Sequence, residues 1–338
     1  MKALALLTAI MALACSALAS PPTLEELWSH LFTNAVIVWQ APTNNLPKSF
    51  WVYQRALPHV FSATVISNAI VLAGFQRHGF PKPSTNDVCI LDDPDCDNCG
   101  CMRVCNFSIR PNDATLSFYS PDQNHLTQNI PNDATVDRLA RNSALKLGVN
   151  LAEVVGKPPT AHFNTDTNDN KLTNQICGRG IFLCRRLDGI DFFSANDDGD
   201  GSEGFVIEFG SYGLIRSFSL CWSEVARYKS QQTASPQEII HCIRAHKTIV
   251  MPGVDEQDYF ARLKTLASAK KLTIIKITPC YGEGVFGEVP TNDVPCKFVT
   301  PFAELEAIAD FGSSNDTVRL LSPILSSEVS RLLGNKPK

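Results

Sequence analysis

The sequence has little net charge and no cluster of basic residues. It carries 30 lysines and arginines against 34 aspartates and glutamates in 338 residues, which gives a formal net charge of −4. Proteins that bind nucleic acid or anionic membranes usually present a dense basic patch, because it attracts phosphate groups. We therefore expect neither a nucleic acid nor a membrane surface as a partner.

Beyond its first 19 residues, the sequence has no unbroken apolar run of the roughly 20 residues that a membrane-spanning helix needs. The amino terminus has Lys2, an apolar run and the small residues Ala17 and Ala19, a pattern typical of a cleavable secretory signal. We predict a signal peptide over residues 1–19, no transmembrane span, and a secreted or periplasmic protein. Lipid attachment at Cys15 is the alternative, although the small Ala12 stands where such signals usually have a larger apolar residue.

Familiar catalytic motifs are also missing. Neither G-x-S-x-G, which carries the nucleophile of many hydrolases, nor H-E-x-x-H, which carries zinc ligands, occurs in the sequence. Residues 282–287 match the G-x-G-x-x-G pattern of dinucleotide-binding loops, but Pro290 and Pro295 follow where such a loop needs a helix. No nucleotide cofactor is therefore predicted.

Cysteine, in contrast, is abundant. The chain has 12 cysteines, and removal of Cys15 with the signal peptide leaves 11. In an oxidising compartment such residues are expected to pair as disulfides, and an odd number leaves one without an intrachain partner. The candidates are Cys89, Cys96, Cys99, Cys101, Cys105, Cys177, Cys184, Cys221, Cys242, Cys280 and Cys296.

Five of these cysteines lie in one loop, residues 89–105, whose Asp, Asn, Gly and Pro residues favour turns. Because little in this loop can form a core, disulfides are its expected cross-links. Zinc is the alternative, since the pairs Cys96-x2-Cys99 and Cys101-x3-Cys105 have spacings that could place four thiolates around the metal.

Two further patterns resemble metal sites. Cys242 and His246 are four residues apart, which places both on one face of a helix, but no second pair of ligands lies nearby. Asp198, Asp200 and Glu203 offer oxygen ligands in a loop that contains glycine, as calcium requires, but isoleucine stands where a calcium loop has its bidentate glutamate. We expect a solvated loop and no cofactor, with calcium as the alternative.

The length of the mature chain exceeds the roughly 250 to 300 residues at which single cores stop growing. We predict an α+β fold in which antiparallel sheets carry helices on one face. Two tandem units are expected, an N-terminal unit over residues 20–130 and a C-terminal domain over residues 131–338.

Local signals place several elements. A helix over residues 134–147 is predicted, with Asp133 as its cap, and Ser235 begins a capping box for a helix over residues 239–246. Residues 61–75 fit either strands or one buried helix, because periodicity does not separate these options. Further strands are predicted at residues 35–39, 107–119, 180–193, 203–222 and 272–278, a further helix at 258–270, and either at 302–311.

The order of these elements in residues 134–245 is similar to that of PepSY-like domains. The segments that carry the resemblance are residues 186–190 (RLDGI), 206–210 (VIEFG) and 213–218 (GLIRSF). The loop at 196–203 and the cysteines depart from the simple pattern of the family. The resemblance implies an exported, noncatalytic module that binds or restrains a partner such as a peptidase, and it provides no catalytic residue.

Two functional hypotheses follow. The preferred one is a noncatalytic binding or regulatory protein that holds a protein or peptide partner at the edge or face of a sheet. The alternative is an exported hydrolase without a recognisable motif, built from residues such as His162, Asp188 and His241 that converge only in the folded chain.

Overall fold

The structure, a computed structural model, describes residues 28–57, 59–74, 89–92, 106–120, 128–166, 171–193, 203–251, 256–283 and 298–334. The predicted signal peptide, most of the cysteine-rich loop, and the calcium candidates Asp198 and Asp200 lie outside these residues. Among the helices of the described part, none has the length and apolar character needed to cross a membrane.

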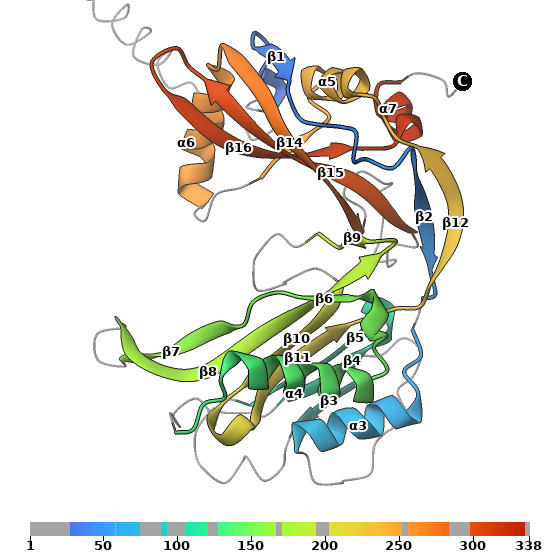
Figure 1. The fold of residues 1–338 in the computed structure, drawn as a ribbon, viewed down its shortest axis with the longest axis vertical. Helices are drawn as coiled ribbons and strands as arrows, with labels where there is room; N and C mark the ends of the chain where they lie inside the picture. The colour runs from blue at the N-terminus through green and yellow to red at the C-terminus, as the bar shows by residue number, and fades with distance from the viewer. Residues whose placement is uncertain are drawn as a thin grey trace, which may run out of the picture.

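Two largely antiparallel sheets face one another, and helices cover the outer face of each (Figure 1). Sheet A has the order β1 (Val36–Trp39), β14 (Lys271–Glu283), β15 (Phe298–Asp310), β16 (Asn315–Pro323) and β13 (Ile249–Val250), with β2 (Ser49–Arg55) paired to β15 and to β12 (Val225–Gln232). Sheet B has the order β3 (Cys89–Asp92), β4 (Asn106–Arg110), β5 (Thr115–Tyr119), β11 (Ile215–Cys221), β10 (Gly204–Phe209), β8 (Lys171–Leu187) and β6 (Val154–Gly156), with β7 (Thr160–Asp166) and β9 (Ile190–Asp191) also paired to β8. The α+β class is thereby confirmed.

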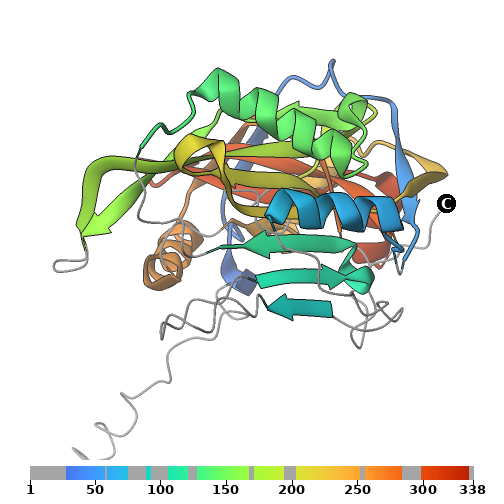
Figure 2. The ribbon, with the colours of Figure 1, turned by 90° about the horizontal axis from the view of Figure 1, so that it is seen from below.

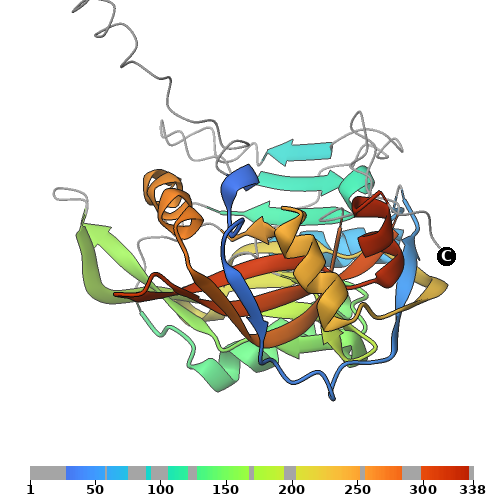
Figure 3. The same ribbon diagram turned by 90° about the horizontal axis from the view of Figure 1, so that it is seen from above.

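Helices α3 (Ala63–Ala73) and α4 (Asp133–Lys146) pack on sheet B, as the view from below shows (Figure 2). Alternate residues of the central strands, among them Phe205 and Phe218, point toward these helices and are fully or almost fully buried. Helices α5 (Pro236–Arg244) and α7 (Ser326–Leu332) lie on the outer face of sheet A, and α6 (Glu256–Ala267) lies beside its strands (Figure 3). Each sheet therefore has a helix-covered face and a face directed toward the other sheet.

Local sequence signals explain the helix ends. The predicted capping box of α5 is confirmed, with Ser235 and Glu238 exchanging hydrogen bonds and a proline in the first turn. The cap of α4 is Asn132 instead of the predicted Asp133, because the Asn132 side chain accepts from the Thr135 backbone N–H. In the ambiguous run at 61–75, α3 forms, and Gly74 ends it in the left-handed conformation.

The hairpin from β8 to β9 brings sheet B close to sheet A. Asp188 and Gly189 both have positive φ angles, 51° and 80°, as a tight two-residue hairpin turn requires. After this turn Phe192 forms a single parallel bridge with Tyr281 of β14. The turn therefore positions one wall of the pocket described below.

The predicted N-terminal unit, residues 20–130, does not form a separate sheet within the described chain. Strands β1 and β2 belong to sheet A, whereas β3, β4 and β5 belong to sheet B. Likewise, β12 and α5, which lie within residues 134–245, associate with sheet A, although the strands before them form sheet B. The predicted boundary therefore does not separate one sheet from the other.

A buried ionic network ties β2 to sheet B. Glu203 pairs with Arg55 at 2.9 Å and with Arg185 at 2.5 Å, and these three side chains are at most 3% exposed. The Ser223 hydroxyl donates to Glu203 at 3.0 Å and accepts from Arg55 Nε at 2.8 Å. Arg185 also pairs with Glu153 at 3.0 Å, so two guanidinium groups are balanced by two carboxylates.

A candidate binding pocket between the two sheets

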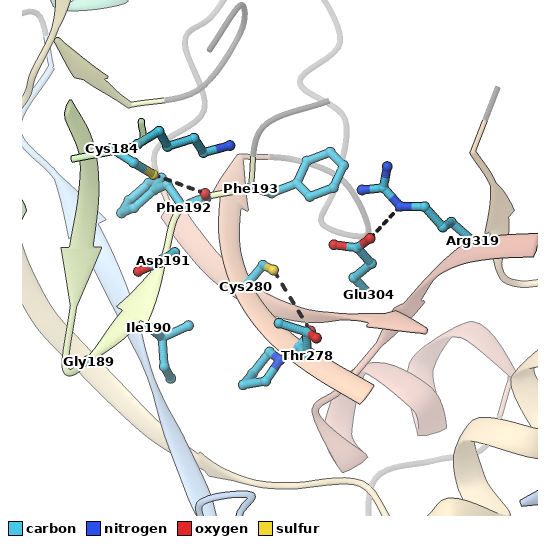
Figure 4. A pocket seen from close by; sticks show the side chains of 12 residues that line it. Cys184, Gly189, Ile190, Asp191, Phe192, Phe193, Thr278, Cys280, Glu304 and Arg319 are labelled. Carbon is cyan, nitrogen blue, oxygen red and sulfur yellow. Dashed lines mark hydrogen bonds and ion pairs between the residues drawn. The ribbon is translucent and has the colours of Figure 1, made fainter. Parts of the chain in front are cut away.

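A cavity of about 370 Å³ lies where the β8–β9 hairpin approaches sheet A (Figure 4). This volume falls at the lower end of the range for ligand sites, roughly 300 to 1,000 Å³. The cavity is lined by Lys157, Cys184, Gly189, Ile190, Asp191, Phe192, Phe193, Thr278, Pro279, Cys280, Glu304 and Arg319. Backbone, aromatic, thiol and charged groups therefore all face one space.

One wall of the cavity is an open edge of β14. Along its full length β14 pairs with β15, but β1 covers its other edge only as far as Ile274, where Gln40 donates to the Ile274 carbonyl at 2.9 Å. That edge next meets the described chain at Tyr281, whose carbonyl accepts from Phe193 N–H at 2.8 Å. Within the described residues, the edge at residues 275–280 pairs with no strand.

Pro279 fits this open edge. Proline has no N–H to donate, so within sheets it occupies edges and not strands that are paired on both sides. In β14, Pro279 is paired with Ala303 on the β15 side, and it lines the cavity. Because backbone groups alternate in direction along a strand, the residues that share the outward direction of Tyr281 are Pro279 and Ile277. The edge thus presents the N–H and C=O of Ile277 and the C=O of Pro279.

Aromatic contacts fix the hairpin against sheet A. Phe193 packs edge-on against Phe302 of β15, with ring centroids 5.4 Å apart, and Phe192 lies 6.0 Å from the ring of Tyr281. Figure 4 shows Phe193 projecting from the hairpin strand on the same side as Cys280 and Glu304. Such ring pairs add stability beyond the apolar area that they bury. These contacts fix the position of the hairpin, and with it one wall of the pocket, relative to sheet A.

Two polar side chains, Tyr53 and Arg227, bind the turn of the β8–β9 hairpin. The Tyr53 hydroxyl donates to the Asp188 carboxylate, and Arg227 of β12 donates to the other oxygen of Asp188 at 2.5 Å. Burial, followed by the hydrogen bond to Asp188, raises the pKa of Tyr53 to about 12. The tyrosine therefore remains a neutral donor at physiological pH.

The pocket contains two thiols, Cys184 and Cys280, that are poor nucleophiles. Burial raises the pKa of Cys184 to about 11 and that of Cys280 to about 12. Their sulfurs lie 3.3 Å from the Phe192 carbonyl and 3.8 Å from the Thr278 carbonyl. Since the thiolate is the reactive form, both groups act as small, neutral wall residues.

Sequence reasoning placed three residues in a hypothetical hydrolase site, and the structure does not bring them together. His162 lies on β7, where its Nδ1 is 3.9 Å from the Glu208 carboxylate. Asp188 lies in the β8–β9 turn with Tyr53 and Arg227, and His241 is exposed on α5, on the outer side of sheet A. None of the three lines the pocket.

The predicted metal candidates also have other surroundings. Glu203 forms an ion pair with Arg55 and accepts hydrogen bonds from Arg185 and Ser223, so its carboxylate oxygens face cations and a hydroxyl of the protein itself. His246 does not share a helical face with Cys242, because α5 ends at Arg244 and His246 has a positive φ of 56°. Within the described residues, no group of three or more His, Cys, Asp and Glu side chains could hold a metal ion.

Four of the cysteines proposed for disulfides are free thiols in the described chain: Cys177, Cys184, Cys242 and Cys280. All four are buried, and a buried cysteine behaves as a small apolar side chain. The predicted pairing is therefore not seen for these residues. For the candidates outside the described residues it stays a prediction.

We expect Cys242 to resist alkylation in the native protein. Its side chain is fully buried, and burial raises its pKa to about 12, so both access and thiolate content are low. Mass spectrometry after iodoacetamide treatment should find Cys242 modified after denaturation and almost unmodified before it. Equal modification rates in the native and denatured protein would contradict the burial of this thiol.

Most pocket residues were missed by sequence analysis, since Lys157, Thr278, Glu304 and Arg319 belong to no motif. Pro279 carried a signal for an edge, because a proline inside a β-rich run marks one, whereas Cys184 and Cys280 were named only as disulfide candidates. Neither a protein-family model nor a curated protein matches this sequence. The resemblance to PepSY-like domains therefore stays a prediction.

Proposed function

We propose that this protein is an exported, noncatalytic binding module that holds an extended segment of a protein or peptide partner in the pocket between its two sheets. The observation that carries the proposal is the open edge of β14 at residues 275–280, part of which lines the cavity. Export rests on the predicted signal peptide. The partner's segment would add to sheet A as a further strand.

An extended peptide suits this wall because strand addition uses backbone hydrogen bonds for affinity and side-chain pockets for selectivity. The edge offers the backbone groups of Ile277 and Pro279, and the cavity beside it accepts side chains. Strand β1 already pairs with the same edge of β14 up to Ile274. An added segment would continue the line of β1 toward the bridge at Tyr281.

A noncatalytic role is supported by the chemistry of the pocket walls. Cys184 and Cys280 are protonated thiols, and the histidines of the described chain do not line the cavity. The charged lining residues Glu304 and Arg319 neutralise each other at 2.5 Å. These features favour recognition of a ligand over its chemical conversion.

Filling the pocket should weaken peptide binding. Thr278→Trp places an indole in the cavity, whereas Lys229→Trp adds the same group at an exposed position of β12 that does not line the cavity. Short random peptides would be selected by display on the purified wild-type protein, and their affinities measured by fluorescence anisotropy. We expect the Thr278→Trp variant to bind at least tenfold more weakly, and the Lys229→Trp variant to bind unchanged.

Thermal melts of both variants serve as the folding control. The proposal is overturned if selection enriches no peptide above background. It is also overturned if the selected peptides bind the folded Thr278→Trp variant as tightly as the wild type.

A further inference from the structure

Two carboxylates, those of Asp191 and Glu304, line the pocket. Asp191 uses its Oδ1 in an ion pair with Arg186 at 2.6 Å, and Glu304 uses its Oε1 in an ion pair with Arg319 at 2.5 Å. Within the described residues, the second oxygen of each carboxylate has no hydrogen-bond partner. Each carboxylate can therefore accept a further hydrogen bond from a ligand.

The two wall thiols show which charges act most strongly in the cavity. Burial is the largest cause of the raised pKa of both thiols. Among the charged groups, Asp191 has the largest effect on Cys184, and Glu304 followed by Asp191 has the largest effect on Cys280. All these effects raise the pKa, and each cation nearby lowers it by less. The strongest charge at each thiol is therefore that of a lining carboxylate, which attracts a cationic ligand group.

Pairing within sheet A places Glu304 in line with Thr278. Thr278 of β14 is paired with Glu304 of β15, so the two side chains lie on the same face of the sheet, and both line the cavity. Figure 4 shows the Glu304 carboxylate on the side of Arg319 that faces Cys280. The carboxylate thus lies one strand away from the open edge of β14.

A segment added at this edge would place one residue in register with Thr278, with its side chain on the same face. Neighbouring strands lie roughly 5 Å apart, so this residue would be roughly 10 Å from Glu304, with only the small Thr278 between them. A short side chain cannot cross that distance. Lys and Arg can, because their long apolar stems lie along a surface while their charged ends donate hydrogen bonds.

We infer that the pocket selects a basic side chain, so that the extended segment bound along β14 carries Lys or Arg in register with Thr278 and donates to the carboxylate of Glu304. This inference rests on the proposed function. It adds the chemical class of the partner, a basic peptide, to the site. Asp191, on the opposite wall, contributes a second negative charge.

Changing the charge of Glu304 should change the preference of the pocket. The same random-peptide display would be run on the wild type, Glu304→Gln and Glu304→Lys. With the wild type we expect Lys or Arg enriched about tenfold at one peptide position. Glu304→Gln should remove this enrichment, and Glu304→Lys should replace it with Asp or Glu.

Substituting Arg319 should have the opposite effect to substituting Glu304. Arg319→Met removes the cation that competes for the carboxylate, so the selected basic peptides should bind this variant about threefold more tightly than the wild type. The same peptides should bind Glu304→Gln about tenfold more weakly, as fluorescence anisotropy would measure. If the ion pair served only the fold, both substitutions would weaken binding alike, and that result would overturn the inference.

Asp316 provides the matched control. It also pairs with an arginine, Arg262 at 3.3 Å, but it does not line the cavity. Asp316→Asn and Asp316→Lys make the same charge changes as the Glu304 variants, and both should keep the basic preference. Thermal melts report whether each variant folds. Because Arg319 is 48% exposed, its charge stays solvated when Glu304 becomes glutamine.

The outcomes separate the two levels of the proposal. Enriched peptides that Thr278→Trp no longer binds but that show no basic preference overturn the basic selectivity and leave the binding module standing. A basic preference that survives Glu304→Gln does the same. Enrichment of no peptide at all overturns both.

Discussion

Replacing Glu203 with glutamine is expected to lower the free energy of unfolding by about 3 to 5 kcal/mol. The substitution keeps the volume of the side chain but removes the carboxylate that lies between Arg55 and Arg185. Both guanidinium groups are almost fully buried, so they would lose an ionic partner where water cannot replace it. Urea denaturation of the two proteins measures the difference.

Glu306→Gln is the matched control for this change. Glu306 lies 4.0 Å from Lys276, and both side chains are well exposed, so the same substitution there should alter stability by at most about 1 kcal/mol. Adding Arg55→Met to Glu203→Gln should recover part of the loss, because one of the two buried cations is then removed. A loss below about 1 kcal/mol for Glu203→Gln would contradict the network as described.

Glu328→Gln is expected to stabilise the protein in a manner that depends on pH. Burial raises the pKa of Glu328 from 4.5 to about 7, and the nearby Arg331 offsets this only in part. One of its carboxylate oxygens, Oε2, is buried without a hydrogen-bond partner in the described chain. The residue lies on α7, close enough to Cys242 of α5 to raise the pKa of that thiol.

The sign of the effect follows from this raised pKa. The folded protein binds the Glu328 proton more tightly than the unfolded chain, so stability is highest below about pH 4.5 and falls as the pH rises toward 7. Above pH 7 the loss amounts to about 3 kcal/mol at most. Melts across this range should show Glu328→Gln more stable than the wild type at high pH and equal to it at low pH.

Glu238 offers the contrasting case on the neighbouring helix. Burial raises its pKa, but hydrogen bonds from Ser235 and Ser326 outweigh burial and hold the pKa below its usual value. Glu238→Gln should therefore destabilise the protein near neutral pH, and this loss should shrink as the pH falls through the pKa of Glu238.

A Glu328→Gln variant whose stability parallels that of the wild type at every pH would contradict the raised pKa of Glu328.

Local chemistry made part of this fold predictable. The capping box at Ser235 depends on residues a few positions apart, and the structure confirms it together with the helix predicted over residues 134–147. The turn at Asp188 and Gly189 was likewise readable, because few residues other than glycine, asparagine and aspartate adopt its φ angles. Hydrophobic periodicity did not decide between strands and a buried helix at residues 61–75, because both options fit the same run of apolar residues.

The pocket could not be predicted in the same way. Its walls come from Lys157, the β8–β9 hairpin, the edge of β14 and two residues of β15 and β16. Packing across the whole chain decides the pairing of strands. The periodicity of the sequence indicates where a strand lies but not which other strand it pairs with. Strand β12 was not predicted, because its residues are mostly exposed and lack the alternation that marks a half-buried strand.

The pairing of β1 with β14 also bears on when this protein can fold. Strand β1 pairs with Lys271–Ile274, which lies far along the chain from it, and β2 likewise pairs with β12 and with Phe298 and Val299. Contacts between such distant segments close large loops and form slowly. Sheet A therefore cannot be completed until β14 and the strands that follow it have been synthesised.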